Sequence, residues 1–159
     1  MEIKKYLQNR SVRFDVIEHD NTYDSQRMAH TIGVGGRHVA KTVLLRADRG
    51  YAYIVAVLPA DTLIDWKAAS HAIGESRLEL ATEIEIAEHC PDCEFGVLPP
   101  FGSQYAMTTL LDEALTEDEG MYFEGNTHHE TIRMDVADFR KLENPLVACF
   151  ARTPDAKLV

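Results

Sequence analysis

Apolar and polar residues alternate along the chain in a way that predicts short helices mixed with strands. Residues 2–10 and 24–33 have the spacing of amphipathic helices, the second with Asp24 or Ser25 as N-cap and Gly33 at its end. Residues 14–19 are strand-like, and residues 37–59 read as two apolar strands joined by the tight turn ADRG. This turn predicts an antiparallel hairpin. Its second strand, YAYIVAVLP, is apolar on both faces, as expected of a central strand.

The same alternation continues downstream. A helix is expected over 61–74 with Trp66 in the core, a strand over 77–80, and a helix over 82–90, where Thr82 and Glu85 have capping-box spacing. Strands are expected over 105–111, 121–125 and 131–135, before a helix over 136–143 capped by Asp135. These elements indicate an α+β fold: a mixed, mostly antiparallel sheet curled into an open barrel with helices packed outside.

Length and patterning together suggest one domain. The chain of 159 residues is long enough for a sizeable core, and we assign residues 1–143 to a single domain. Residues 144–159 are expected to form a C-terminal tail that docks through Leu146, Val147 and Phe150, while its last residues fray.

Charge is distributed unevenly. The formal net charge is −10, yet residues 1–50 carry +3 and residues 51–159 carry −13. An acidic surface keeps a protein soluble and disfavours long nucleic acids, whose phosphates bind Lys and Arg. Arg37, Arg46 and Arg49 lie close to Lys41 in the sequence, however, and predict a small basic patch suited to one end of a nucleic acid.

The apolar runs, the first residues and the cysteines bear on the location of the protein and on its cofactors. No apolar run reaches the roughly 18 residues of a membrane span, and the first residues lack the apolar core of a signal peptide, so we expect a cytoplasmic protein with no membrane contact. Three cysteines make no disulfide framework. HCPDC, residues 89–93, has C-x-x-C spacing, but zinc usually needs a second ligand pair and a redox pair usually opens a helix. No metal or cofactor is expected.

Lys41 is the first candidate for chemistry. Alternation along a strand places it on the face of Val39, Val43 and Leu45. Such a lysine either extends its ammonium to water from a strand end or lies at a pocket that binds an anionic or carbonyl-bearing ligand.

The second candidate is the stretch PDCEFGVLPPFGSQ, residues 91–104. Three prolines and two glycines exclude regular structure. Gly96 permits close approach of a ligand to the backbone, while Pro99 and Pro100 stiffen the loop. Backbone N–H groups in such a loop can stabilise the oxyanion of an ester hydrolysis. Without its pairing with Lys41, a plain surface loop would be the default interpretation.

An ordered set of motifs carries a family resemblance. VAKTVLL, AVLPAD, LELATEIEIAEHC, FGVLPPFG, LLDEAL and MYFEGNTHHETIRM follow one another between about Phe14 and Leu142. In this order they resemble the YbaK-like aminoacyl-tRNA deacylases, relatives of the editing domain inserted in prolyl-tRNA synthetase. The resemblance implies hydrolysis of the ester that joins a wrong amino acid to tRNA.

The resemblance also implies roles for individual residues. Lys41 and Gly96 match the family's catalytic positions, and the expected substrate contacts are His19, Pro99, Pro100, Phe101, Gly102, Gly125, His128 and His129. Glu124 stands where a small residue is expected before Gly125. Either histidine of the later pair could transfer a proton or bind the substrate, or could simply be a turn residue.

Two functions from different classes follow. The first is a trans-acting deacylase whose partner is the acceptor end of mischarged aminoacyl-tRNA, with an aminoacyl-tRNA synthetase as a further possible partner. The alternative is a non-catalytic binding module of the same fold that recognises a tRNA end, a nucleotide or a protein.

Overall fold

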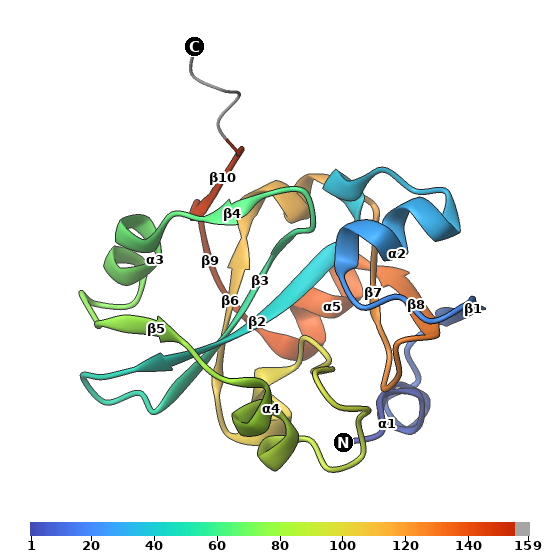
Figure 1. The fold of residues 1–159 in the computed structure, drawn as a ribbon, viewed down its shortest axis with the longest axis horizontal. Helices are drawn as coiled ribbons and strands as arrows, with labels where there is room; N and C mark the ends of the chain where they lie inside the picture. Colours follow the sequence, from blue (N-terminus) through green and yellow to red (C-terminus); the bar gives the residue numbers. More distant parts are fainter. Residues whose placement is uncertain (155–159) are drawn as a thin grey trace.

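A computed structural model describes residues 1–154, and its centre is a five-stranded sheet (Figure 1). The strand order is β5-β2-β3-β6-β9. The strands span Leu78–Leu80 (β5), Ala40–Ala47 (β2), Tyr53–Pro59 (β3), Thr108–Asp112 (β6) and Leu146–Ala148 (β9). The predicted hairpin of β2 and β3 is antiparallel, and β3, apolar on both faces, is central; β6 and β9 add in parallel.

The remaining strands form two smaller sheets. An antiparallel sheet, β1-β8-β7, stands beside the central sheet on the side of α1 and α2 (Figure 1). Its strands span Phe14–Glu18 (β1), Gly120–Glu124 (β7) and Glu130–Asp135 (β8), while Leu63–Ile64 (β4) pairs with Ala151–Arg152 (β10).

The α+β class is confirmed, but the predicted barrel is wrong, because no sheet within residues 1–154 is closed or curled into one. One edge of β2 is paired with β3 along its length, and its other edge is taken by β5 from Leu45 onward. Within the described part of the chain, the one backbone bridge between β7 and this region joins Tyr122 to Val39. A single bridge does not continue the ladder of hydrogen bonds that barrel closure requires.

The helices surround these sheets. They span Ile3–Asn9 (α1), Ser25–Ile32 (α2), Trp66–Ala72 (α3), Glu83–His89 (α4) and Val136–Glu143 (α5), with 3-10 turns at Gly36–His38, Gly102–Tyr105 and Glu113–Glu117. Two predicted ends are confirmed: the Asp24 side chain caps α2, which ends at left-handed Gly33, and Thr82 and Glu85 form a capping box on α4. None of the helices described is long and apolar enough to cross a bilayer.

The helix predicted over 61–74 is shorter than expected. Residues 63–64 form β4, and the Asp65 side chain caps α3 by accepting from the backbone N–H of Ala68. The cap places Trp66 at the start of the helix, where its side chain is 42% exposed rather than in the core.

Residues 144–152 are part of the fold. Leu146 and Val147 lie on β9, the outer strand of the central sheet, and Phe150 is fully buried. The last five residues of the predicted tail, 155–159, lie outside the described residues, as does their predicted fraying.

The core has two main parts, which contact opposite faces of β2 and β3. Ala40 and Leu44 belong to one cluster, with Leu98 and Phe101 of the Gly/Pro loop. Leu45 belongs to the other, which includes residues of α3 and β4. Alternation along β2 therefore decides which side chains can meet the loop.

Candidate functional site

The segment after α4 forms one wall of a cleft. The cleft has a volume of about 340 Å³ and is lined by Tyr23, Glu83, Glu94, Phe95, Gly96 and His128. These residues come from the loop before α2, the first turn of α4, the Gly/Pro loop and the turn between β7 and β8. Two of the residues predicted from the sequence, Gly96 and His128, thus lie in one cleft.

Gly96 has a backbone that favours glycine. Its φ is +88°, in the left-handed region. The N–H of Val97 donates to the Glu94 carbonyl, which closes a tight turn, whereas the Gly96 N–H donates to no group within residues 1–154. A Cβ on Gly96 would meet nothing closer than Glu83 Oε1, at 3.7 Å. Gly96 therefore brings an unsatisfied donor to the cleft.

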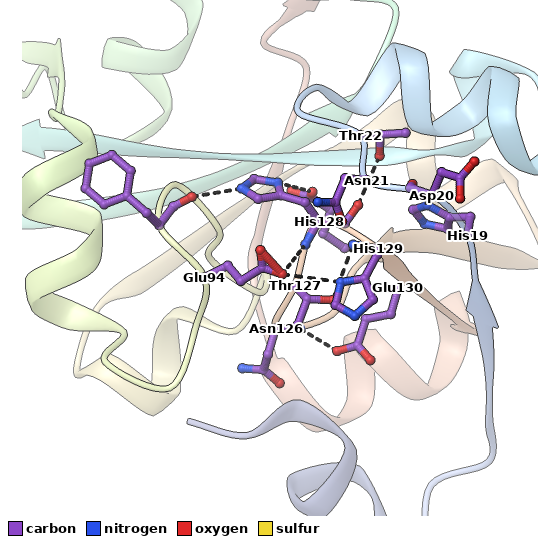
Figure 2. Close-up of polar contacts among 12 residues, drawn as sticks. His19, Asp20, Asn21, Thr22, Glu94, Asn126, Thr127, His128, His129 and Glu130 are labelled. Carbon is purple, nitrogen blue, oxygen red and sulfur yellow. Dashed lines mark hydrogen bonds and ion pairs between the residues drawn. The ribbon is translucent and has the colours of Figure 1, made fainter.

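His128 holds the Gly/Pro loop in place (Figure 2). Its Nε2 lies 2.8 Å from the Phe95 carbonyl oxygen, its Nδ1 lies 3.1 Å from Glu124 Oε2, and its backbone N–H donates to Glu94. A carbonyl oxygen only accepts, so Nε2 carries a hydrogen. Both ring nitrogens are engaged, which leaves neither for a substrate in this arrangement. The Tyr23 ring packs against the imidazole, with centroids 4.8 Å apart.

Both members of the Glu124–His128 pair have raised pKa values. Burial raises the pKa of the Glu124 carboxyl to about 7, against the opposing effect of His128. Burial lowers the pKa of His128, but its hydrogen bond to the Phe95 carbonyl and the charge of Glu124 together raise it above its usual value. The hydrogen bond between His128 Nδ1 and Glu124 Oε2 needs one proton, carried either by Nδ1 or by the carboxyl, in addition to the proton on Nε2.

The other two predicted histidines are not among the residues that line this cleft. Figure 2 shows His129 next to Glu94 and His19 further away, next to Asp20. His129 Nδ1 lies 3.3 Å from Glu94 Oε1, with its side chain about half exposed. His19 donates from Nδ1 to the Asp20 carbonyl, and its Nε2 lies 2.8 Å from Thr131 Oγ1. His129 helps to fix Glu94, while His19 joins β1 to β8.

The later part of the Gly/Pro loop is buried. Pro99 and Pro100 are buried, and Phe101 packs edge to face against Tyr6, Phe123 and Phe139. These contacts place Phe101 in the core.

The glycines Gly102 and Gly125 have packing roles in the structure. A Cβ on Gly102 would lie 2.6 Å from Thr109 Oγ1, and a Cβ on Gly125 would lie 2.6 Å from Glu130 Oε1. Neither glycine lines the cleft.

Lys41 lies on the opposite side of β2 from the Gly/Pro loop. It shares the face of Leu45, as the alternation predicts, and Leu45 belongs to the cluster that contains α3 and β4. Its ammonium donates to the Thr62 carbonyl. Burial lowers the pKa of Lys41, an effect that the nearby Asp61 carboxylate partly offsets. Lys41 is not among the residues that line the cleft.

The three predicted arginines do not form one patch. Arg37 lies in the 3-10 turn before β2 and Arg49 in the turn after it. Seven steps along β2 separate these ends by about 23 Å. Arg46 donates to the Leu80 carbonyl and lies 3.5 Å from Glu85 Oε1. Their sequence proximity reflects one extended strand, which spreads its ends apart.

A disulfide joins Cys90 to Cys93, at the start of the Gly/Pro loop, although the sequence predicted no disulfide. The Asn126 side chain donates to Cys93 Sγ. Within residues 1–154, no group of three or more His, Cys, Asp and Glu side chains is arranged to hold a metal ion.

Four residues that line the cleft were not predicted from the sequence: Tyr23, Glu83, Glu94 and Phe95. Glu94 and Phe95 directly precede Gly96, so their proximity to the motif was an available indication. Nothing in the local sequence of Tyr23 or Glu83 indicates their position, because distant segments bring them to Gly96.

The model of the aminoacyl-tRNA editing domain family matches residues 19–142. The match covers most of the chain, and it includes both the strand with Lys41 and the cleft loop. The chain belongs to the aminoacyl-tRNA editing domain family.

Curated relatives are similar to nearly the whole chain. The Multifunctional Ser/Thr-tRNA deacylase ProXp-y of Escherichia coli (strain K12) is 24% identical over 151 residues, 92% of this chain and 89% of that protein. The Prolyl-tRNA editing protein ProX of Acetoanaerobium sticklandii is 22% identical over 140 residues, with 86% and 85% covered.

Solved structures share the fold. One, provisionally described as a trans-editing enzyme for prolyl tRNA synthetase, superposes with a TM-score of 0.82 at 20% identity over 95% of both chains. The hypothetical protein APE2540 gives a TM-score of 0.85 at 16% identity, over 96% of this chain and all of the other. At sequence identities this low, the similarity to these structures shows the fold alone.

Proposed function

We propose that this chain is a trans-acting aminoacyl-tRNA deacylase, which hydrolyses the ester between a mischarged amino acid and the acceptor end of tRNA. Family membership and the names of the curated relatives support the reaction. The observation that carries the site is Gly96, which lines the cleft and whose N–H donates to no group within residues 1–154. The reaction is expected in the cytoplasm, where tRNA is charged.

Gly96 supplies the oxyanion contact in this proposal. Attack of water on the ester carbonyl places negative charge on its oxygen, and a preorganised N–H lowers the free energy of that state. Removal of one such donor typically costs about 100-fold or more in rate. The hydrogen bond from His128 Nε2 to the Phe95 carbonyl fixes the peptide unit between Phe95 and Gly96, and thereby the direction of this donor.

Lys41 has the second assigned role. We propose that its ammonium binds the ribose-phosphate end of the acceptor strand, because its hydrogen-bond partner in the fold, the Thr62 carbonyl, is uncharged. A phosphate oxygen is a stronger partner for an ammonium than a neutral carbonyl is. The exposed Arg37 and Arg49 are proposed as separate phosphate contacts beyond the two ends of β2, and Arg46 contributes less because Glu85 lies beside it.

The remaining predicted substrate contacts divide by position. His128 and His129 are proposed to act by holding the cleft loop, and His19 by fixing the strand beside it. Pro99, Pro100, Phe101, Gly102 and Gly125 are proposed to support the loop from the core rather than to touch the substrate.

The test is deacylation of a panel of tRNAs charged with alanine, cysteine, serine, threonine and proline, by the wild type and by Lys41→Ala. The wild type is expected to hydrolyse one or two of them, and the variant to lose this activity while its unfolding transition changes little. Hydrolysis of none, with tRNA binding intact, would favour the non-catalytic binding module. Full activity of Lys41→Ala would remove the role assigned to Lys41.

A further inference from the structure

Glu83 brings an unpaired carboxylate to the cleft. It lies in the first turn of α4, exposed to solvent, with Oε1 3.7 Å from the point that a Cβ on Gly96 would occupy. The other acidic groups around the cleft have partners: Glu94 is held by His129 and Glu124 by His128. No hydrogen bond or ion pair engages the Glu83 carboxylate within residues 1–154. A charge is therefore available beside Gly96.

Two aromatic side chains flank the same space with exposed surfaces. Tyr23 is 73% exposed and Phe95 is 56% exposed, although both line the cleft. An aromatic face attracts a cation through its quadrupole, and a carboxylate adds a charge-assisted hydrogen bond. Together with Glu83 they make a site that favours an ammonium group.

The position of Glu83 also matters for the reaction. A carboxylate close to an oxyanion donor opposes catalysis, because it repels the negative charge that develops there. A cation between the two removes this conflict. In an aminoacyl ester the α-nitrogen and the carbonyl oxygen are about 3 Å apart, so a carbonyl oxygen bound at Gly96 brings its α-ammonium within reach of Glu83.

We propose that Glu83 binds the α-ammonium of the aminoacyl group and restricts the substrates to esters whose α-amine is free. This inference rests on the proposed function, in which the Gly96 N–H binds the ester carbonyl. N-acylation removes the positive charge that the Glu83 carboxylate and the two rings would bind. Esters with a blocked amine, the class to which peptidyl-tRNA belongs, are therefore excluded, while aminoacyl esters are hydrolysed.

The test compares one aminoacyl-tRNA with its N-acetylated form. Seryl-tRNA and N-acetyl-seryl-tRNA, or the pair for whichever amino acid the wild type removes fastest, are assayed with the wild type, Glu83→Gln and Glu88→Gln. Glu88 is an exposed residue on the same helix with no contact to the cleft, so it controls for the loss of one charge. Thermal unfolding establishes that the variants are folded.

The wild type is expected to prefer the free amine by about tenfold or more, as the loss of a charge-assisted hydrogen bond predicts. Glu83→Gln should reduce this preference to near unity, mainly by slowing the free-amine substrate, and Glu88→Gln should keep it. Equal hydrolysis of both esters by the wild type, or an unchanged preference in Glu83→Gln, would overturn the inference and leave the deacylase intact.

Binding separates failure of this inference from failure of the proposed function. If the wild type hydrolyses no ester, calorimetry with 3′-serylamino-3′-deoxyadenosine and its N-acetyl form tests the ammonium site without hydrolysis. Tighter binding of the free amine, lost in Glu83→Gln, would support the site in a protein that is not a deacylase. Equal affinities would overturn it.

Discussion

The two halves of the Gly/Pro loop differ in what surrounds them. Glu94, Phe95 and Gly96 face the cleft and are tied to the turn between β7 and β8 by polar contacts. Phe101 and Gly102 face the core and are fixed by close packing. One continuous motif thus presents a donor at its front and anchors it at its rear. A glycine or proline in a family motif can therefore stabilise the packing of the loop instead of contacting the substrate.

The largest effect on stability is expected at the rear half. Phe101→Ala should lower the free energy of unfolding by about 3–5 kcal/mol, because it removes a fully buried aromatic ring from a cluster of aromatic side chains. Urea denaturation measures the change. Phe95→Ala, which truncates an exposed ring at the front half, should change it by less than about 0.5 kcal/mol. Similar losses of unfolding free energy in the two variants would contradict the difference between the front and rear halves of the loop.

A smaller loss is expected for Gly102→Ala. Its Cβ would lie 2.6 Å from Thr109 Oγ1 and 2.9 Å from the Met107 carbonyl oxygen, and the latter is backbone. Such overpacking costs about 1–3 kcal/mol, again measured by urea denaturation. Gly35→Ala is the matched control, because its Cβ has ordinary contacts and its φ is negative. If the two variants unfold at the same urea concentration, Gly102 has no packing role.

The front half should respond to pH. Folding raises the pKa of Glu124 to about 7 and raises that of His128. Their contribution to stability is fully present below the pKa values of the unfolded chain, about 4.3 and 6.5, and is lost as the pH rises through the folded values. We expect a loss on the order of 2 kcal/mol between pH 5 and pH 8.

Comparison of the wild type with Glu124→Gln isolates this contribution, because Asp48 and Glu85 have lowered pKa values and give the opposite trend in both proteins. The variant should have a flatter dependence of unfolding free energy on pH. Hydrogen exchange at Glu94 and Val97, whose N–H groups donate to the Asn126 and Glu94 carbonyls, should rise with pH more than intrinsic exchange predicts, while exchange at Gly102 should not. Identical pH profiles for the two proteins would contradict the raised pKa of Glu124.

The smallest effects are expected far from both halves. Arg37→Ala and Arg49→Ala should each weaken tRNA binding by less than about tenfold and lower the slope of log affinity against log salt by about 1. Fluorescence titration across salt concentrations measures both values. Because the two arginines lie at opposite ends of β2, their effects should add. Strong coupling between them would mean that they form one patch.

Local sequence was sufficient for most of the secondary structure. Caps at Asp24 and Thr82 and the apolar hairpin depend on neighbouring residues, and the structure confirms them. The division into three sheets depends instead on which strand occupies the free edge of β2, and no local pattern encodes that pairing.

The site could be predicted only in part for the same reason. Gly96 could be predicted from its motif. Glu83 could not, because it lies near Gly96 only once α4 and the Gly/Pro loop have folded against each other. Lys41 shows the converse: motif order placed it beside Gly96, but strand alternation puts its side chain on the other face of β2. The C-x-x-C pair was visible in the sequence, and its bonding became apparent only in the fold.

The most direct test of the central claim is the deacylation rate of Gly96→Ala measured beside Gly74→Ala. Both glycines have left-handed backbones and room for a Cβ, since a Cβ on Gly74 has no neighbour within 4 Å, so both variants carry a similar conformational cost of about 1–2 kcal/mol. Only Gly96 lines the cleft. We predict that Gly96→Ala slows deacylation by about 100-fold or more while Gly74→Ala resembles the wild type. Alanine keeps the N–H, but its Cβ obstructs the close approach of the ester carbonyl, and a misplacement of about 1 Å can cost about 100-fold in rate. Equal rates for the two variants would contradict the assignment of Gly96 as the donor to the ester.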